Sequence, residues 1–195
     1  MHWQAVLQAG VGIVLIAAAL TKTTGGSSVR PFLNALGVAP QLGRFLNGAL
    51  PIAEGACGVG LLLSISPWAA AGAVVLSAGF AVALVTALRG GVTVGCRCFG
   101  SLDRGQTTSV TAARAITLAL AALVLLGVQL DNPASGRLDP QQPLELTATL
   151  GMGVLAAAVY LTTFSLLARV QGFERDRARV QGQIRAQRTA EGKLE

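Results

Sequence analysis

The sequence predicts an all-α membrane protein: a four-helix transmembrane bundle, followed by a fifth transmembrane helix and a basic helical tail. Of its 195 residues, 52% are hydrophobic and only 12% are charged, whereas soluble domains carry about 25% charged residues. The apolar residues form five runs of about 18–22 residues, close to the ~20 that a helix needs to cross a bilayer. We therefore expect a multi-pass protein of the cell membrane, in contact with lipid, and no nucleic-acid binding from its net charge of +6.

The first apolar run covers residues 3–20 and is closed by Lys22. A cleaved signal peptide would need a charged start and a small-residue cleavage site. Only His2 precedes the run, and residues 21–28 contain no such site, so we expect a retained first transmembrane helix. After a loop that ends at residue 28, residues 29–36 have the apolar side chains of a short helix that lies in the membrane interface.

The second and third runs, residues 46–65 and 68–88, are joined by a short turn. The second run contains Pro51, which can bend a membrane helix without ending it, and also Glu54 and Cys57. Cys57 lies one helical turn from Glu54 and so on the same helix face. A lone buried cysteine usually serves packing; the alternative is a third redox partner for the two cysteines of the next loop.

Four regions follow from the order of the runs: the four-span bundle over residues 1–128, a polar loop over 129–145, a fifth span over 146–168 and a basic tail over 169–195. The fourth span includes Arg114. The tail has the alanine, glutamine, arginine and glutamate content of a helix, and its arginines suit the anionic lipids of an inner leaflet.

Two of the three cysteines lie in the loop between the third and fourth runs, in the stretch Gly95-Cys96-Arg97-Cys98. Thiolate is the reactive form of cysteine, and a neighbouring cation such as Arg97 favours it. A disulfide across one residue is strained, and strained disulfides are more easily reduced. We therefore favour a redox-active pair over two ordinary loop cysteines. We expect no metal site, because a closed zinc site needs four ligands and His2 is the only histidine.

Three charged residues of the runs belong to the membrane half that carries the cysteine loop. Counting crossings places Lys22 at this face, and Glu54 and Arg114 about 10 Å below it at 1.5 Å per residue. Charges in hydrocarbon are costly unless paired, so we expect Glu54 to pair with Arg114. One interpretation is that the pair is purely structural and fixes the register of the helices. It could also form a polar pocket under Cys96 and Cys98, in which Arg114 or Lys22 favours a thiolate and Glu54 carries a proton.

With these residues placed, the sequence resembles the MauE/DoxX-like superfamily of small bacterial membrane proteins, and most closely the MauE (methylamine utilisation protein) family. The resemblance covers roughly residues 6–126. Its most specific feature is the Cys-x-Cys-Phe-Gly motif. The features that carry it are Lys22, Pro51 and Glu54 as Pro-x-x-Glu, Cys96, Cys98, Phe99 and Gly100 in the loop, and Arg114.

The resemblance implies a four-helix DoxX-like core and a role with a thioredoxin-like partner. That role is disulfide formation or maturation of exported proteins. For the methylamine utilisation protein that gives the family its name, the exported protein is methylamine dehydrogenase. The first functional hypothesis is thus a membrane thiol–disulfide redox protein, with quinone as a candidate electron carrier. The alternatives are a non-redox membrane scaffold or assembly factor, and a small-molecule transporter that uses Glu54 and Arg114.

The orientation of the cysteine loop follows from the distribution of lysine and arginine. With five spans, nearly all of these residues, the tail included, fall on the face of the cysteine loop, and the opposite face has only Arg137. Cytoplasmic loops carry the excess of lysine and arginine, which predicts cytoplasmic cysteines. A role with exported proteins favours instead cysteines that face outward, where disulfides persist. We choose the cytoplasmic orientation, because the tail arginines have no role in the site.

Overall fold

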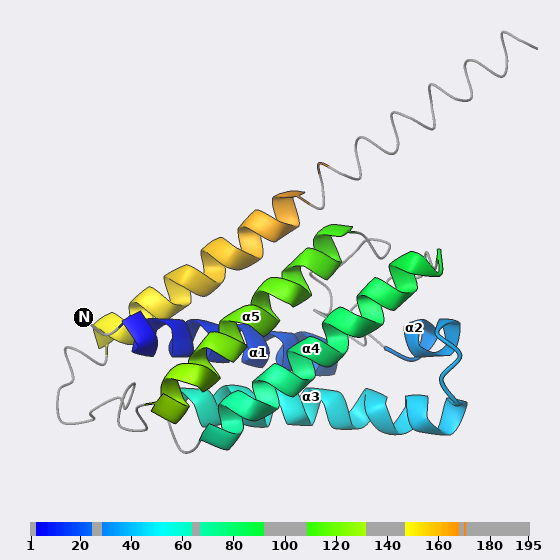
Figure 1. Cartoon of the computed structure of the whole chain (residues 1–195), viewed down its shortest axis with the longest axis horizontal. Coiled ribbons are helices and arrows are strands. Elements are labelled where there is room, and N and C mark those ends of the chain that lie inside the picture. The colour runs from blue at the N-terminus through cyan, green and yellow to red at the C-terminus, as the bar shows by residue number, and fades with distance from the viewer. Residues whose placement is uncertain are drawn as a thin grey trace, which may run out of the picture.

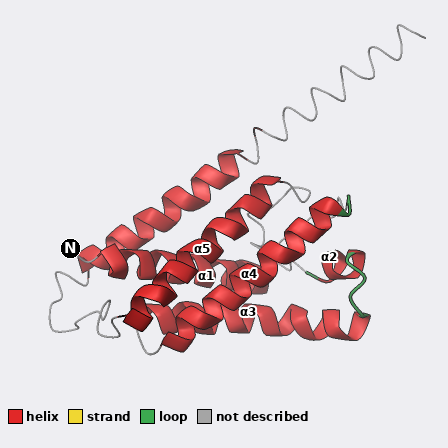
Figure 2. Ribbon diagram, viewed as in Figure 1, coloured by secondary structure: helices red, strands yellow, loops and turns green. Residues whose placement is uncertain are grey.

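Every long element of the described structure is an α-helix. The computed structural model describes residues 3–24, 29–63, 67–91, 109–131, 147–167 and 170. Within these ranges five helices are long and apolar enough to span a membrane (Figures 1 and 2). They are α1 (Trp3–Thr24), α3 (Pro40–Leu62), α4 (Pro67–Arg89), α5 (Ser109–Asp131) and a helix Thr147–Leu167, here named the C-terminal span. The expected all-α membrane fold with five candidate spans is confirmed.

The connection between α1 and α3 contains the short helix α2 (Arg30–Ala35), which agrees with the short helix expected there. Gly37 follows it with φ of 78°, a left-handed conformation that favours glycine, and so ends the helix. The helix α3 then begins at Pro40, earlier than the predicted residue 46, because Ala39 is extended and proline suits the first turn of a helix. Pro51 lies inside α3 without ending it.

Glycines set the closest contact between α1 and α3. A Cβ atom at Gly58 would lie 2.7 Å from Cγ1 of Ile16 and 2.8 Å from the carbonyl oxygen of Gly12. Gly55, one turn earlier on α3, faces Ala19, so the two helices run antiparallel. Small residues allow membrane helices to approach to backbone contact, and this crossing brings the last turn of α1 beside the middle of α3.

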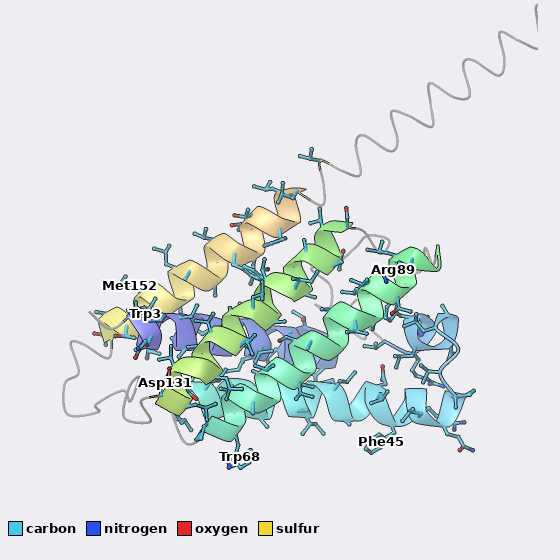
Figure 3. All side chains as sticks on the ribbon, in the orientation of Figure 1. Trp3, Phe45, Trp68, Arg89, Asp131 and Met152 are labelled. Carbon is cyan, nitrogen blue, oxygen red and sulfur yellow. The ribbon has the colours of Figure 1, made fainter. Side chains whose placement is uncertain are left out.

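The helices α4 and α5 also run antiparallel, and the C-terminal span lies along α5 and crosses the start of α1 (Figure 1). A Cβ atom at Gly153 would lie 2.6 Å from Cβ of Ala9, which makes this crossing another backbone contact. Trp3, Asp131 and Met152 lie toward one end of the bundle, and Arg89 lies at the other (Figure 3). Side chains such as Ile52, Trp68 and Leu155 are exposed on the outer surface, as expected for helices that face lipid.

Candidate functional site

The centre of the candidate site is a buried ion pair between α1 and α3. Lys22 in the last turn of α1 donates a hydrogen bond to Oε1 of Glu54, and their side chains are 1% and 2% exposed. Removing two charges from water is costly, and close pairing offsets part of this cost. The Lys22 ammonium also lies 4.7 Å from the ring centroid of Phe80, a cation–π distance. Three helices, α1, α3 and α4, therefore meet at one ammonium group.

The second carboxylate oxygen of Glu54 accepts no hydrogen bond from the described part of the chain. Oε2 is buried and has no hydrogen-bond partner among the described residues. Buried polar atoms nearly always have a partner, so this oxygen is an available acceptor. It could take up a proton, or a hydrogen bond from a group outside the described ranges.

The expected pair between Glu54 and Arg114 is wrong, because the ion pair that the structure gives Glu54 is with Lys22. The expectation rested on the similar depths of Glu54 and Arg114 along their runs, with Lys22 closer to the membrane face. Depth does not fix the rotation of each helix about its axis, and this rotation decides which cation faces the carboxylate. Arg114 is buried where α5 meets the C-terminal span, and its guanidinium carbon lies 5.8 Å from the ring centroid of Tyr160. The expected charges thus separate into two sites.

The contact around Arg114 includes residues that sequence reasoning missed. Tyr160 Oη donates a 2.6 Å hydrogen bond to the Arg114 carbonyl oxygen, and Thr117 Oγ1 donates a 2.9 Å bond to the same oxygen. The ring of Tyr160 also contacts that of Phe164, with centroids 4.9 Å apart. The sequence did contain a signal for Tyr160, because it is the only tyrosine in the chain and lies within an apolar span. Phe80, beside Lys22, gave no comparable signal among the other apolar residues of its run.

Cys57 is a free, half-buried cysteine that packs against α4. A Cβ atom at Gly72 would lie 2.6 Å from its Sγ, so the thiol occupies the space that this glycine leaves. This contact agrees with the packing role expected of a lone cysteine. Among the described residues, no group of three or more His, Cys, Asp or Glu side chains is placed to hold a metal ion.

Cys96 and Cys98 lie outside the described residues, between Gly91 and Ser109. The helices that flank their loop are described: α4 ends at Arg89 and α5 begins at Ser109. These two ends lie at the same end of the bundle as the end of α1 and the start of α3 (Figure 1). The loop is therefore anchored at the end of the bundle that carries Lys22.

Comparison with known proteins identifies one family. The family model described as methylamine utilisation protein MauE matches residues 2–127. This segment covers α1 to α4 and most of α5, and the C-terminal span lies beyond it. No curated protein and no solved structure matches the chain. All five candidate site residues lie within the matched segment: Lys22, Glu54, Cys96, Cys98 and Arg114.

Proposed function

Because the chain belongs to the MauE family of methylamine utilisation proteins, we propose that it is a membrane thiol–disulfide redox protein with Cys96 and Cys98 as the reacting pair. Its partner is a thioredoxin-like protein, and the reaction serves disulfide formation or maturation of exported proteins. The observation that carries this proposal is the buried ion pair that joins Lys22, in the last turn of α1, to Glu54, in the middle of α3. The last turn of α1 lies at the end of the bundle to which the cysteine loop is anchored (Figure 1). Intramembrane charges of this kind mark functional sites by default.

The reaction transfers two electrons and two protons. A thiolate of the partner attacks the Cys96–Cys98 disulfide, which breaks that S–S bond and forms a mixed disulfide with one cysteine. A second partner thiolate then attacks the mixed disulfide, so that the partner leaves oxidised and the pair is left reduced. A membrane quinone is the electron acceptor that restores the disulfide, and it takes up the two electrons and two protons to become a hydroquinone.

Lys22 and Glu54 have distinct roles in this proposal. The Lys22 ammonium supplies positive charge at the loop-bearing end of the bundle, and positive charge stabilises a thiolate. Glu54 holds Lys22 in place through Oε1 and keeps Oε2 available for a proton released when the thiols are oxidised. Arg114, five residues after the start of α5, adds a second buried cation near that end.

Thiol trapping in membranes tests this function. In a Cys57→Ser background, only Cys96 and Cys98 can react with an alkylating reagent, and a mass shift counts the free thiols. We expect two free thiols after a reduced thioredoxin-like protein is added, and none after an oxidised quinone is added. Glu54→Gln should slow the shift, while Arg44→Gln, which removes an exposed charge on the same helix, should not. A pair that stays fully alkylated under oxidising conditions would rule out the redox function.

The non-redox alternatives make the opposite prediction for the cysteines. A scaffold or transporter would keep its function when Cys96 and Cys98 are both serine. A transport pathway through Glu54 and Arg114 has less support, because these residues contact different partners, Lys22 and Tyr160.

A further inference from the structure

A groove lies between α1, α5 and the C-terminal span, away from the Lys22–Glu54 pair. Its volume is about 680 Å³, within the roughly 300–1,000 Å³ of small-molecule sites. Apolar side chains such as Val6, Val11 and Met152 form most of its wall. The hydroxyl groups of Thr117 and Tyr160 lie side by side in this lining, and Thr149 lines the groove nearer the start of the C-terminal span.

The hydroxyl groups of Thr117 and Tyr160 already donate hydrogen bonds within the protein, so the sites that they leave for a ligand are acceptor lone pairs. Tyr160 Oη and Thr117 Oγ1 each carry a single hydrogen, and both donate to the Arg114 carbonyl oxygen. The two oxygens lie 3.3 Å apart, so any hydrogen bond between them also uses a proton of the same cluster. The part of the groove at Thr117 and Tyr160 therefore presents lone pairs, which suit a ligand with a hydroxyl donor.

The depth of this cluster and the uncharged residues that line the groove disfavour a charged head group. Thr117 lies eight residues from the start of α5, about 12 Å along the axis, and Tyr160 lies seven residues before Leu167, about 10 Å. Both positions are inside a hydrocarbon layer of about 30 Å, where a phosphate or ammonium group is costly. A neutral hydroxyl can reach this depth.

We propose that the groove binds a neutral, lipid-soluble molecule with an apolar body and a hydroxyl head group, which donates a hydrogen bond to Tyr160 or Thr117. The wall on the C-terminal span runs from Ala148 to Tyr160, about 18 Å along the axis, and accepts an extended chain. A membrane hydroquinone and a long-chain alcohol share this chemistry. The C-terminal span, which lies beyond the family match, supplies one wall of the site.

A pair of photoreactive probes tests the hydroxyl requirement. One is a long-chain alcohol with a diazirine in its tail, and the other is the O-methyl ether of the same alcohol, which cannot donate. Each is added at the same mole fraction to the full-length protein in lipid nanodiscs, and labelled peptides are quantified by mass spectrometry. We expect the alcohol to label the groove about fivefold more than the ether, the effect of one hydrogen bond between neutral groups. Equal labelling would mean non-selective solvation by lipid chains and would overturn the proposal.

Variants and competitors locate the site and identify the source of the ligand. Ala156→Trp fills the groove and should abolish the excess labelling, while Ala158→Trp, on the same helix but outside the groove, should keep it. Thr117→Val combined with Tyr160→Phe should lower labelling by the alcohol to that by the ether. Competition by an unlabelled isoprenoid hydroquinone indicates a quinone source, and competition by an unlabelled alcohol indicates a lipid alcohol. Failure of both competitors, or equal labelling of the two tryptophan variants, would contradict the proposal.

Discussion

Lys22 of α1 and Glu54 of α3 form a hydrogen-bonded ion pair whose side chains are 1% and 2% exposed. Breaking a buried pair by removing one partner leaves an uncompensated charge and costs about 3–5 kcal/mol. The pair therefore contributes to the stability of the bundle. A substitution that tests its role in proton transfer also changes this stability.

The first prediction is energetic coupling between these two residues. Lys22→Met or Glu54→Gln alone should each lower the free energy of unfolding by about 3–5 kcal/mol. The double variant should cost less than the sum of the two, because no unpaired charge is left. Unfolding in mixed detergent micelles measures each value. The control cycle combines Glu54→Gln with Arg114→Met and should be close to additive, since these residues do not form an ion pair. Coupling in the control cycle and none between Lys22 and Glu54 would contradict the assigned pair.

The second prediction concerns the crossing of α1 and α3. Gly58→Ala should destabilise the protein by about 1–3 kcal/mol, because the added methyl group would meet Ile16 and the backbone of Gly12. Gly48→Ala is the matched control on the same helix, since nothing lies within 4 Å of a Cβ atom there. It should be neutral or stabilising by up to about 1 kcal/mol through the better helix propensity of alanine. Similar effects of both variants on thermal unfolding would argue against the close crossing.

The third prediction concerns the cysteine pair. Cys96→Ser and Cys98→Ser should each abolish function in a complementation assay while the protein stays in the membrane, because a disulfide needs both thiols. Cys57→Ser is the control and should keep function, as its thiol packs against Gly72. Full activity of the double serine variant would favour the scaffold hypothesis.

The fourth prediction is the number of crossings. Five spans place the amino and carboxyl termini on opposite faces of the membrane. Reporter fusions after residue 128 and after residue 170 should therefore differ in their side, because the C-terminal span lies between them. Two fusions on the same side would show that this helix does not cross.

The fifth prediction is orientation. The excess of lysine and arginine on the face of the cysteine loop predicts that this face is cytoplasmic. In intact cells of the Cys57→Ser variant, a membrane-impermeant thiol reagent should leave Cys96 and Cys98 unlabelled, and should label them after the membrane is opened. Labelling in intact cells would reverse the orientation and favour a partner on the outer side.

The sequence by itself determined the membrane fold, because five apolar runs of about 20 residues have few alternatives in a bilayer. It also singled out Lys22, Glu54 and Arg114 as candidate site residues, because charged residues are conspicuous in apolar runs. The start of α3 was predicted late, because hydropathy does not register the polar first turns that Pro40 initiates.

Only the tertiary structure decided which of these residues meet. Position in a run gives depth, but the partner of a side chain depends on the rotation of each helix about its axis and on the closeness of the crossings. Contacts of Gly58 with α1 place Glu54 beside Lys22, and the hydroxyl of Tyr160 holds the C-terminal span against Arg114. These contacts join residues far apart in the chain, and no local pattern in the sequence specifies them.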